Sequence, residues 1–234
     1  MIRSGLERLI TLTSRDGKRA FFDTSRFSWV GEVEGAWQDI LAELRKLLKH
    51  RDRIPNFQDV SADQAVLTQG TDWKTFFLYA YGHKLEENCS QCPLTAKALQ
   101  RIPGMKTAMF SILAPGKHIP EHRGPYRGVL RYHLGLIIPE QAGACRIRVR
   151  EEVRYWSPGK SLIFDDSYLH EVWNDTDEER IVLFVDFERP LPFPVSALNR
   201  AVIKRIGNTE FVTDAVSNIR GTSKSKPSNQ NPET

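Results

Sequence analysis

Short apolar runs separated by turn residues fill the second half of this chain, and they constrain its fold more than any other feature. Stretches such as Ala114-Pro115-Gly116-Lys117 and Ser157-Pro158-Gly159-Lys160 interrupt the runs. Many short strands at roughly regular spacing are typical of a double-sheet jelly roll or a small antiparallel barrel. We therefore expect a mainly β protein with flanking helices. The expected strands span residues 105–113, 118–122, 129–138, 145–150, 161–164, 170–173 and 180–187.

Two histidines lie in these expected strands, His122 before Arg123-Gly124-Pro125 and His170 before Glu171-Val172-Trp173. They are far apart in the sequence, so they can meet only if the intervening strands fold back on one another, as they do in an antiparallel barrel. If the two imidazoles meet, they can hold a metal ion.

Cations lie in the same part of the chain, where burial would be costly unless an anion joins them. Alternate side chains of the expected strand 129–138 share a face, which puts Arg131 and His133 on one face and the apolar residues on the other. Arg180 begins a run that is apolar on both faces and is therefore expected to be buried. Because a guanidinium is a planar fork of donors that fits a carboxylate, the two arginines predict an acid as ligand.

Helices are expected on either side of the strands. Residues 34–50 have apolar side chains at helical spacing and basic residues near the end, which predicts an amphipathic helix against one face of the barrel. Residues 73–81 are an expected strand, and helices are expected at 93–101 and 196–206. We divide the chain into an N-terminal segment that packs on the core (1–72), a β core (73–190), a helical C-terminal extension (191–216) and a disordered tail (217–234).

Composition and charge exclude several classes of function. The chain has 234 residues, 40% of them hydrophobic, enough for one substantial core. A net charge of +4 with interspersed acids and bases gives no nucleic-acid-binding stripe. Charges within residues 1–12, and the lack of an apolar run long enough to span a bilayer, predict no signal peptide, no transmembrane anchor and a cytoplasmic location.

Three cysteines cannot all pair, which fits a reducing compartment. The pair Cys89-Ser90-Gln91-Cys92 has the spacing of half a zinc site or of a redox pair. No second pair with this spacing follows, so we favour a loop with ordinary thiols.

A metal held by two histidines in a jelly roll points to the non-haem Fe(II) oxygenases, although imidazole also suits zinc, copper and nickel. These oxygenases use a carboxylate as third ligand, usually two residues after the first histidine. Here that position is Gly124, which supplies no ligand. Water, Glu121, Asp165 or Asp166 remain as the third ligand.

Four sequence blocks occur in order through the β-rich half. They are His122-Arg123-Gly124-Pro125, residues 130–136, residues 162–167, and His170-Glu171-Val172-Trp173 with Arg180 beyond. Together, from about Trp73 to Pro190, they resemble the aspartyl/asparaginyl β-hydroxylase family. The resemblance implies a distorted double-stranded β-helix, which is a cupin-like jelly roll, and the activity of an Fe(II)- and 2-oxoglutarate-dependent dioxygenase.

The resemblance also implies roles for individual residues. His122 and His170 would hold the iron, and the family too has glycine at the position of Gly124. The implied contacts to 2-oxoglutarate are Ser111, Arg131, His133 and Arg180, with Trp73 as a weaker candidate. Trp173 is expected to pack beneath His170, and His118 to lie near the mouth of the site without being a ligand.

The implied reaction consumes O2 and 2-oxoglutarate, releases succinate and CO2, and hydroxylates an unactivated C–H bond. Aspartyl and asparaginyl side chains are the family's named substrates, so we expect hydroxylation at their β-carbon in a peptide or protein, or of a small acidic substrate. Residues 131–136 and Glu188-Arg189-Pro190 are also similar to bacterial lipid A acyl 2-hydroxylases, which leaves a lipid or a small molecule as the alternative.

A non-catalytic cupin-like module that binds a metal or an acid without turnover is the alternative from another class. The combination of two histidines with Arg180 disfavours it, because such a module would have no reason to keep both.

Overall fold

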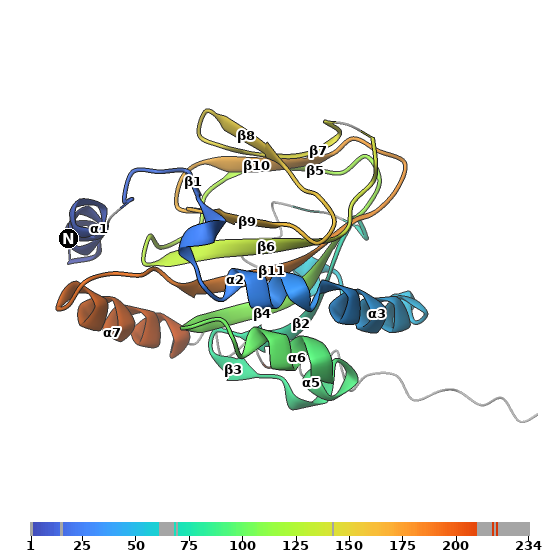
Figure 1. Ribbon diagram of the computed structural model, residues 1–234, viewed down its shortest axis with the longest axis horizontal. Coiled ribbons are helices and arrows are strands. Elements are labelled where there is room, and N and C mark those ends of the chain that lie inside the picture. The colour runs from blue at the N-terminus through green and yellow to red at the C-terminus, as the bar shows by residue number, and fades with distance from the viewer. Residues whose placement is uncertain are drawn as a thin grey trace, which may run out of the picture.

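Two antiparallel β-sheets face each other in the part of the chain that the structure, a computed structural model, describes (Figure 1). That part comprises residues 2–14, 16–60, 68, 70–141, 143–209, 217 and 219. Its strands are β1 (Phe21–Phe22), β2 (Trp73–Ala80), β3 (His83–Lys84), β4 (Met105–Leu113), β5 (His118–His122), β6 (Val129–Ile137), β7 (Cys145–Val149), β8 (Glu152–Tyr155), β9 (Ser161–Phe164), β10 (His170–Asn174) and β11 (Arg180–Glu188). Within this part, the larger sheet has the order β1-β9-β6-β11-β4-β2-β3 and the smaller β5-β10-β7-β8.

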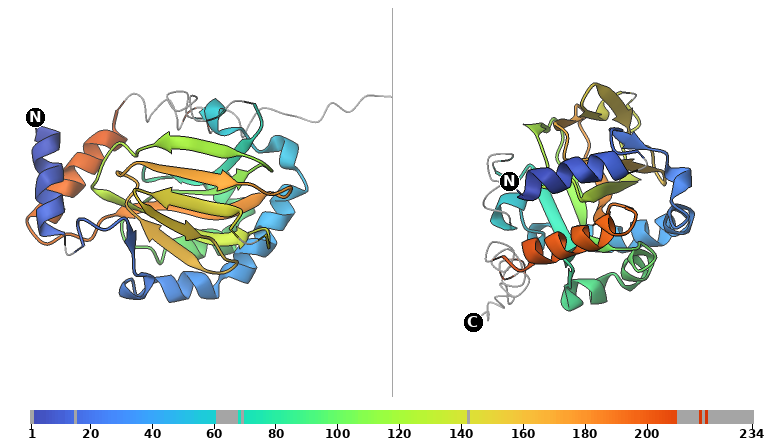
Figure 2. Two further views of the ribbon diagram at one scale, coloured as in Figure 1. Left: turned by 90° about the horizontal axis from the view of Figure 1, so that it is seen from above. Right: turned by 90° about the vertical axis from the view of Figure 1, so that its left-hand side faces the viewer.

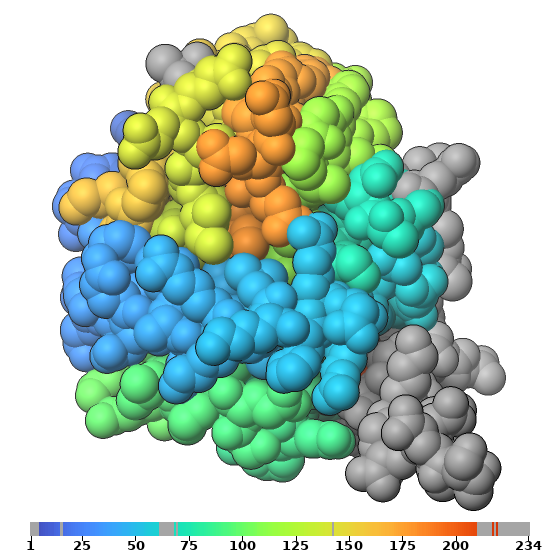
Figure 3. Space-filling view, turned by 90° about the vertical axis from the view of Figure 1, so that its right-hand side faces the viewer, coloured from blue at the N-terminus to red at the C-terminus, as the bar shows by residue number. Residues whose placement is uncertain are grey.

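The larger sheet is buried on both faces because helices cover the side that faces away from the smaller sheet. The helices are α1 (Ile2–Thr13), α2 (Val30–Gly35), α3 (Trp37–Leu48), α4 (Phe57–Val60), α5 (Glu86–Gln91), α6 (Pro93–Leu99) and α7 (Val195–Gly207). One apolar cluster joins α2, α3, α5 and α6 to the outer face of the sheet. Figure 3 shows α3, in light blue, between the α5 and α6 region, in green, and the strands above.

A second apolar cluster fills the space between the two sheets. In strand β6 the side chains alternate between two buried faces, as a strand between two packed layers requires. Leu130, Tyr132 and Leu134 point into the helix-covered cluster, whereas His133 points to the other side and touches Phe184. Strand β11 is apolar on both faces and pairs with β4 and β6, which explains its place at the centre. His133 is therefore buried on the face between the two sheets, close enough to Arg180, Arg131 and His170 for their charges to act on it.

Helix α3 confirms the amphipathic pattern, since Ile40, Leu41 and Leu44 are buried. Its buried Glu43 has a specific partner: the carboxylate accepts hydrogen bonds from the backbone nitrogens of Leu94 (2.9 Å) and Thr95 (2.8 Å). These are first-turn donors of α6, which begins at Pro93. The carboxylate therefore caps α6 and holds the two helices together.

The mainly β fold with flanking helices is confirmed, and every expected strand is present within a residue or two of its bounds. Several expectations are corrected. Cys89 lies in helix α5 instead of a loop, and all three thiols are free and buried. Helices α1 and α4 occupy segments for which no helix was predicted. The expected disordered tail lies outside the described residues except for 217 and 219.

Candidate active site

His122 and His170 meet because they are directly opposite each other on neighbouring antiparallel strands. Strands β5 and β10 pair with these two residues in register, and the centroids of the two rings are 4.1 Å apart. Side chains at opposite positions of a strand pair lie on the same face of the sheet. Of the predicted site residues, these two are the pair that the backbone register itself brings together.

Hydrogen bonds to the backbone set the tautomer of both rings. Nδ1 of His122 donates to the carbonyl oxygen of Pro120 (2.8 Å), and Nδ1 of His170 donates to that of Tyr168 (2.9 Å). A carbonyl oxygen can only accept, so each Nδ1 carries the proton and the lone pair of the neutral ring lies on Nε2. This is the form in which imidazole binds a metal, with its other nitrogen fixed by a backbone carbonyl.

Burial keeps the two rings neutral. It lowers the pKa of His122, and it lowers the pKa of His170 to about 3, with the neighbouring charge of a protonated His122 acting in the same direction. Both imidazoles are therefore uncharged near neutral pH. Neutral, preoriented nitrogens suit a transition metal better than a proton-binding role.

The carboxylates that sequence left open as a third ligand lie in different environments. Glu121 points outward, where Arg148 donates to it (3.0 Å). Asp165 is fully buried and accepts from Arg189 and from Ser167. No group of three or more His, Cys, Asp or Glu side chains among the described residues is arranged to hold a metal.

Asp166 is the carboxylate nearest to the position of the missing ligand. A Cβ on Gly124 would collide with its carboxylate, and the backbone nitrogen of Gly124 donates to the Asp166 carbonyl oxygen (2.7 Å). Arg131 lies 2.8 Å from Oδ2 of Asp166. Desolvation raises the pKa of Asp166 to about 7 in spite of this cation. The absent side chain of Gly124 therefore leaves the room that Asp166 occupies.

Arg180 is a buried cation whose donors are not fully used. It is 2% exposed, and its Nε and Nη1 have no hydrogen-bond partner among the described residues. The guanidinium lies over the ring of Trp156, 4.7 Å from its centroid. Burial lowers the pKa of Arg180 to about 10. Unused donors of a buried guanidinium are costly, and an acid that entered beside them would remove that cost.

His133 and Trp156 share this property with Arg180. Both ring nitrogens of His133 and Nε1 of Trp156 are buried without a partner among the described residues. Burial, helped by the positive charges of Arg180 and Arg131, lowers the pKa of His133 well below its usual value. Trp156 was not among the predicted site residues. Its position just before the turn Ser157-Pro158-Gly159 was a weak signal, because a tryptophan there is usually part of the core.

Arg131 differs from Arg180 because internal carboxylates already bind it. Its Nε and Nη2 donate to the two oxygens of Asp186 (2.9 and 3.3 Å), and Nη2 also pairs with Asp166. The guanidinium packs over Phe184, 4.2 Å from the ring centroid. The predicted contact of Arg131 with a ligand stays a prediction, and its observed partners are the carboxylates of Asp186 and of Asp166, the latter beside Gly124.

Ser111 and Trp73 lie on adjacent strands and bind each other. Nε1 of Trp73 donates to Oγ of Ser111 (3.0 Å), and both side chains are buried. Trp73 also stacks on Phe57, with ring centroids 3.9 Å apart. The indole therefore fixes the hydroxyl, and a contact of either side chain with a ligand remains a prediction.

A cavity of about 170 Å³ is lined by His122 together with residues of α4 and α7. Its polar lining includes Arg131, Asp166 and Asp186. The rest of the lining is mostly apolar and includes Phe57, Val60, Trp73, Phe77, Met109, Phe184, Ile203 and Ile206. The cavity thus joins one metal-binding candidate to an apolar wall formed partly by the C-terminal helix.

Trp173 does not pack beneath His170, so that expectation was wrong. Residues three apart on a strand face opposite sides of the sheet, and Trp173 lies on the outer face of the smaller sheet. There it stacks on His118, with ring centroids 5.0 Å apart, and Arg146 lies over its ring. His118 binds Glu171 (3.0 Å) and is not part of the site.

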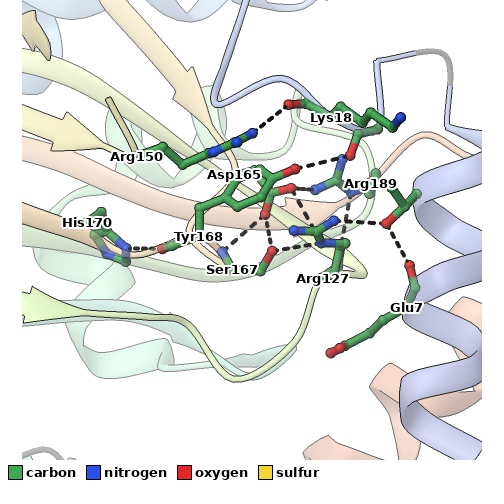
Figure 4. A network of polar contacts seen from close by, with 11 residues as sticks. Glu7, Lys18, Arg127, Arg150, Asp165, Ser167, Tyr168, His170 and Arg189 are labelled. Atoms are coloured by element: carbon green, nitrogen blue, oxygen red, sulfur yellow. Dashed lines mark hydrogen bonds and ion pairs between the residues drawn. The ribbon is translucent and has the colours of Figure 1, made fainter. Parts of the chain in front are cut away.

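A buried polar network holds the loop that leads into His170 (Figure 4). Oγ of Ser167 donates to Asp165 (2.6 Å) and accepts from Nε of Arg127 (3.0 Å). Arg189 donates both to Asp165 and to the carbonyl oxygen of Arg127 (2.8 Å). Tyr168 follows Ser167 directly and supplies the carbonyl oxygen that orients the ring of His170. The network therefore helps to fix the orientation of His170 by holding the loop that precedes it.

Comparison with known proteins shows the family of the chain. A family model described as aspartyl/asparaginyl beta-hydroxylase matches residues 34–190. An ornithine lipid ester-linked acyl 2-hydroxylase from Rhizobium tropici is 49% identical over 202 residues, which cover 86% of this chain and 72% of that protein. The human aspartyl/asparaginyl beta-hydroxylase is 40% identical over 129 residues, or 53% of this chain. The matched region spans only 17% of the length of the human protein.

Solved structures show the same fold. A prolyl hydroxylase from Trichoplax adhaerens, in complex with a hypoxia inducible factor peptide fragment, superposes with a TM-score of 0.51 at 14% identity. The superposition covers 85% of this chain and 94% of that one, which confirms the double-stranded β-helix expected from the sequence. With two thirds of its length matched by the family model, the chain belongs to the aspartyl/asparaginyl β-hydroxylase family of enzymes.

Proposed function

We propose that this protein is an Fe(II)- and 2-oxoglutarate-dependent dioxygenase that hydroxylates carbon 2 of an acyl chain in an ornithine lipid or a related aminolipid. In this reaction the acyl C–H bond, O2 and 2-oxoglutarate give the C–OH group, succinate and CO2. The observation that carries the proposal is the combination of two neutral, in-register imidazoles with an apolar cavity that ends at one of them.

The donor set fits a ferrous ion. His122 and His170 offer two Nε2 lone pairs from opposed strands and would hold the iron. Bound iron would supply the oxidising chemistry that an unactivated C–H bond requires. The contribution of the chain is to hold both rings in one tautomer and to place Asp166 in the space that Gly124 leaves.

The polar groups without partners fit 2-oxoglutarate. Nε and Nη1 of Arg180 would bind the carboxylate that does not reach the metal, and the nitrogens of His133 and Trp156 would bind further oxygens. Their burial excludes water, which strengthens each charge-assisted hydrogen bond. A site of this kind favours a compact dicarboxylic acid.

The cavity favours an acyl chain as the substrate. Its walls are largely aromatic and aliphatic, and at about 170 Å³ it is smaller than the roughly 300–1,000 Å³ of most small-molecule pockets. It would therefore hold the part of a chain around the reactive carbon and leave the polar headgroup outside. The 49% identity to the Rhizobium tropici acyl 2-hydroxylase, over most of both chains, supports this choice.

An aspartyl side chain of a peptide is the second candidate. Arg123 lies next to His122 and lines the cavity, so a cation for an acidic substrate is present at its mouth. The similarity to the human aspartyl/asparaginyl beta-hydroxylase also favours it, although over a shorter part of this chain.

The test is turnover with Fe(II), ascorbate and 2-oxoglutarate on two substrates side by side, an ornithine lipid and an aspartate-containing peptide. We expect succinate and a mass gain of one oxygen on the lipid, with fragment ions that place the hydroxyl on carbon 2 of the acyl chain. The His170→Ala protein serves as the blank for oxidation without the enzyme. A mass gain on the peptide alone would replace the lipid by the second candidate. If neither substrate gains oxygen and no succinate forms, the dioxygenase proposal is wrong.

A further inference from the structure

We propose that the end of the molecule formed by α1 and α7 docks on the surface of an anionic phospholipid bilayer. The two helices lie together at one end of the molecule, at the left of Figure 1 and facing the viewer in the right-hand panel of Figure 2. The choice of a bilayer as the occupant rests partly on the proposed function, because a lipid substrate has to be reached where it resides.

Exposed apolar side chains gather at this end. Among the described residues, large hydrophobic side chains are exposed at seven positions, and four of these lie on α1, on α7 or in the segment just before α7. Phe193 is 83% exposed, Leu12 70%, Leu198 52% and Leu9 37%. Isolated exposed hydrophobics are ordinary on a protein surface, but a group of them on two contacting helices marks an interaction surface.

The charge on these helices favours an anionic partner. The sequence of α7 carries Arg200, Lys204 and Arg205 and no acidic residue, and each of these cations is exposed. Arg8 adds an exposed cation on α1. Lysine and arginine beside aromatic and aliphatic side chains on a helix are the pattern of helices that lie on a membrane surface. A second protein copy would bring the same cations and would be repelled.

The inner face of the same helix reaches the proposed active site. Ile203 and Ile206 line the cavity that leads to His122. Asn199 accepts a hydrogen bond from the hydroxyl of Tyr126 (2.8 Å) and donates to the carbonyl oxygen of Gly128 (2.8 Å), and Tyr126 also lines the cavity. One face of α7 therefore meets solvent with cations and Leu198, while the other forms part of the cavity wall.

Because α7 borders both the proposed membrane surface and the cavity, docking would bring the cavity close to the lipid substrate. None of the helices in the described ranges is long and apolar enough to cross a bilayer. Phe193, Leu198 and Leu12 would instead enter the headgroup region, and the cations would pair with lipid phosphates. An acyl chain that leaves the bilayer beside α7 would then have a short path into the cavity.

The experiment measures binding of the metal-free protein to vesicles of phosphatidylcholine alone and to vesicles of phosphatidylcholine with phosphatidylglycerol in equal parts, by co-sedimentation. We expect binding to the anionic vesicles that weakens with added salt. The triple variant Arg200→Gln/Lys204→Gln/Arg205→Gln should lower the partition coefficient roughly tenfold or more. The matched control is Arg45→Gln/Lys46→Gln/Lys49→Gln, which removes the same charge from the last turn and the C-cap of α3 at the opposite end of the molecule (Figure 1) and should leave binding unchanged.

A second pair of variants tests the apolar part. Leu198→Glu should reduce binding to the anionic vesicles, whereas Leu94→Glu, at a site of similar exposure (47%) on α6, should not. Circular dichroism of all variants shows whether a loss of binding reflects unfolding. Equal losses in both triple variants, equal binding to both vesicle types, or no binding by the wild type would overturn the proposal. A dimer in solution that Leu198→Glu dissociates would likewise overturn it.

Failure of this inference can be told apart from failure of the proposed function. Vesicle binding is measured without iron or 2-oxoglutarate, so it does not depend on turnover. If the α7 triple variant loses hydroxylation of a vesicle-borne lipid but keeps it on a detergent-dispersed lipid, both proposals stand. If the wild type binds anionic vesicles but hydroxylates no lipid, only the proposed function fails.

Discussion

The carboxylate of Asp166 occupies the space into which any side chain on Gly124 would project. In oxygenases that use two histidines and a carboxylate, this is where the third ligand begins. Here Asp166 reaches the same region from the loop before His170, and Arg131 holds it there. The glycine is thus required by the packing around it, because the chain has placed another carboxylate where a ligand side chain would go.

This relationship predicts that Gly124→Asp cannot rebuild a conventional ligand set. The new side chain would overlap with Asp166, so we expect loss of turnover, and Gly124→Ala should already lower the free energy of unfolding by about 1–3 kcal/mol. Urea unfolding and succinate formation measure the two effects. Gly31→Ala is the control, because a Cβ there meets nothing within 4 Å. The double variant Gly124→Asp/Asp166→Gly should recover the stability. If Gly124→Asp folds with wild-type stability, the packing argument is wrong.

Removal of either metal-binding candidate should weaken metal binding and abolish turnover. We expect His122→Ala and His170→Ala to weaken binding of Fe(II), or of Mn(II) as a stable substitute, by at least about 100-fold, and to stop turnover. Isothermal titration calorimetry under anaerobic conditions measures the affinity. His118→Ala is the matched control, since this histidine binds Glu171 on the outer face of the smaller sheet. Unchanged affinity in both alanine variants would reject the assignment.

Because Arg180 has donors without partners, its replacement should have opposite effects on the stability of the ligand-free protein and on the binding of 2-oxoglutarate. Arg180→Met removes a buried charge that lacks a full set of partners, so the free energy of unfolding of the ligand-free protein should stay the same or rise. The same variant should raise the 2-oxoglutarate requirement by roughly 10- to 150-fold, which corresponds to the loss of about 1.5–3 kcal/mol of charge-assisted hydrogen bonding.

Thermal unfolding with and without 2-oxoglutarate checks both effects. The acid should raise the Tm of the wild type but not that of Arg180→Met. Arg146→Met, on the outer face, serves as the control and should respond like the wild type. A wild-type response of Arg180→Met to the acid would show that the acid binds elsewhere.

The buried imidazole of His133 predicts how stability depends on pH. Burial lowers its pKa well below the usual value, whereas in the unfolded chain the ring titrates near about 6.5. Below that pH the unfolded state binds a proton that the folded state does not, so its stabilising contribution is complete above about pH 6.5 and is lost as the pH falls. His170, with a pKa of about 3, acts in the same sense.

For one group the slope is about 1.4 kcal/mol per pH unit below about pH 6.5. His133→Gln should therefore flatten the dependence of the free energy of unfolding on pH by this amount. Urea unfolding of the metal-free protein between about pH 5 and 7 measures the slope. A variant with the wild-type slope would contradict the assignment of this titration to His133.

Much of the fold followed from local pattern, and the errors have physical causes. Alternation in 129–137 and the all-apolar run after Arg180 report burial directly, so β6 and β11 were predicted correctly. Helix α1 was missed because its buried side chains, Leu6 and Ile10, pack against Tyr126 and Val195, which are far away in the sequence. Helix α5 was missed because it has only six residues and its buried residues, Asn88 and Cys89, form no apolar stripe at helical spacing.

The site was predictable to the extent that it follows from strand register. His122 and His170 face each other because their strands pair in this register, and Arg180 is buried as its apolar surroundings in the sequence predicted, while its contact with an anion stays a prediction. Sequence alone could not separate Arg131 from Arg180, because only tertiary packing gives Arg131 the carboxylates of Asp166 and Asp186. Packing also decides that Trp173 lies outside the site and that Trp156 lies beside Arg180.

Because α7 forms part of the cavity wall, a substitution there should change which lengths of acyl chain the enzyme accepts. Ile206 is partly buried and lines the cavity, so Ile206→Trp should fill the space that an acyl chain would use. Each methylene group of the substrate that the cavity no longer buries would forfeit about 0.8 kcal/mol, so kcat/KM for a long-chain lipid should fall roughly tenfold or more. A short-chain analogue that does not reach Ile206 should be hydroxylated at nearly the wild-type rate.

Ala201→Trp, on the exposed side of the same helix, is the control. Detergent-dispersed substrates keep any effect on membrane docking out of the comparison, and equal losses for long and short chains would place the substrate elsewhere.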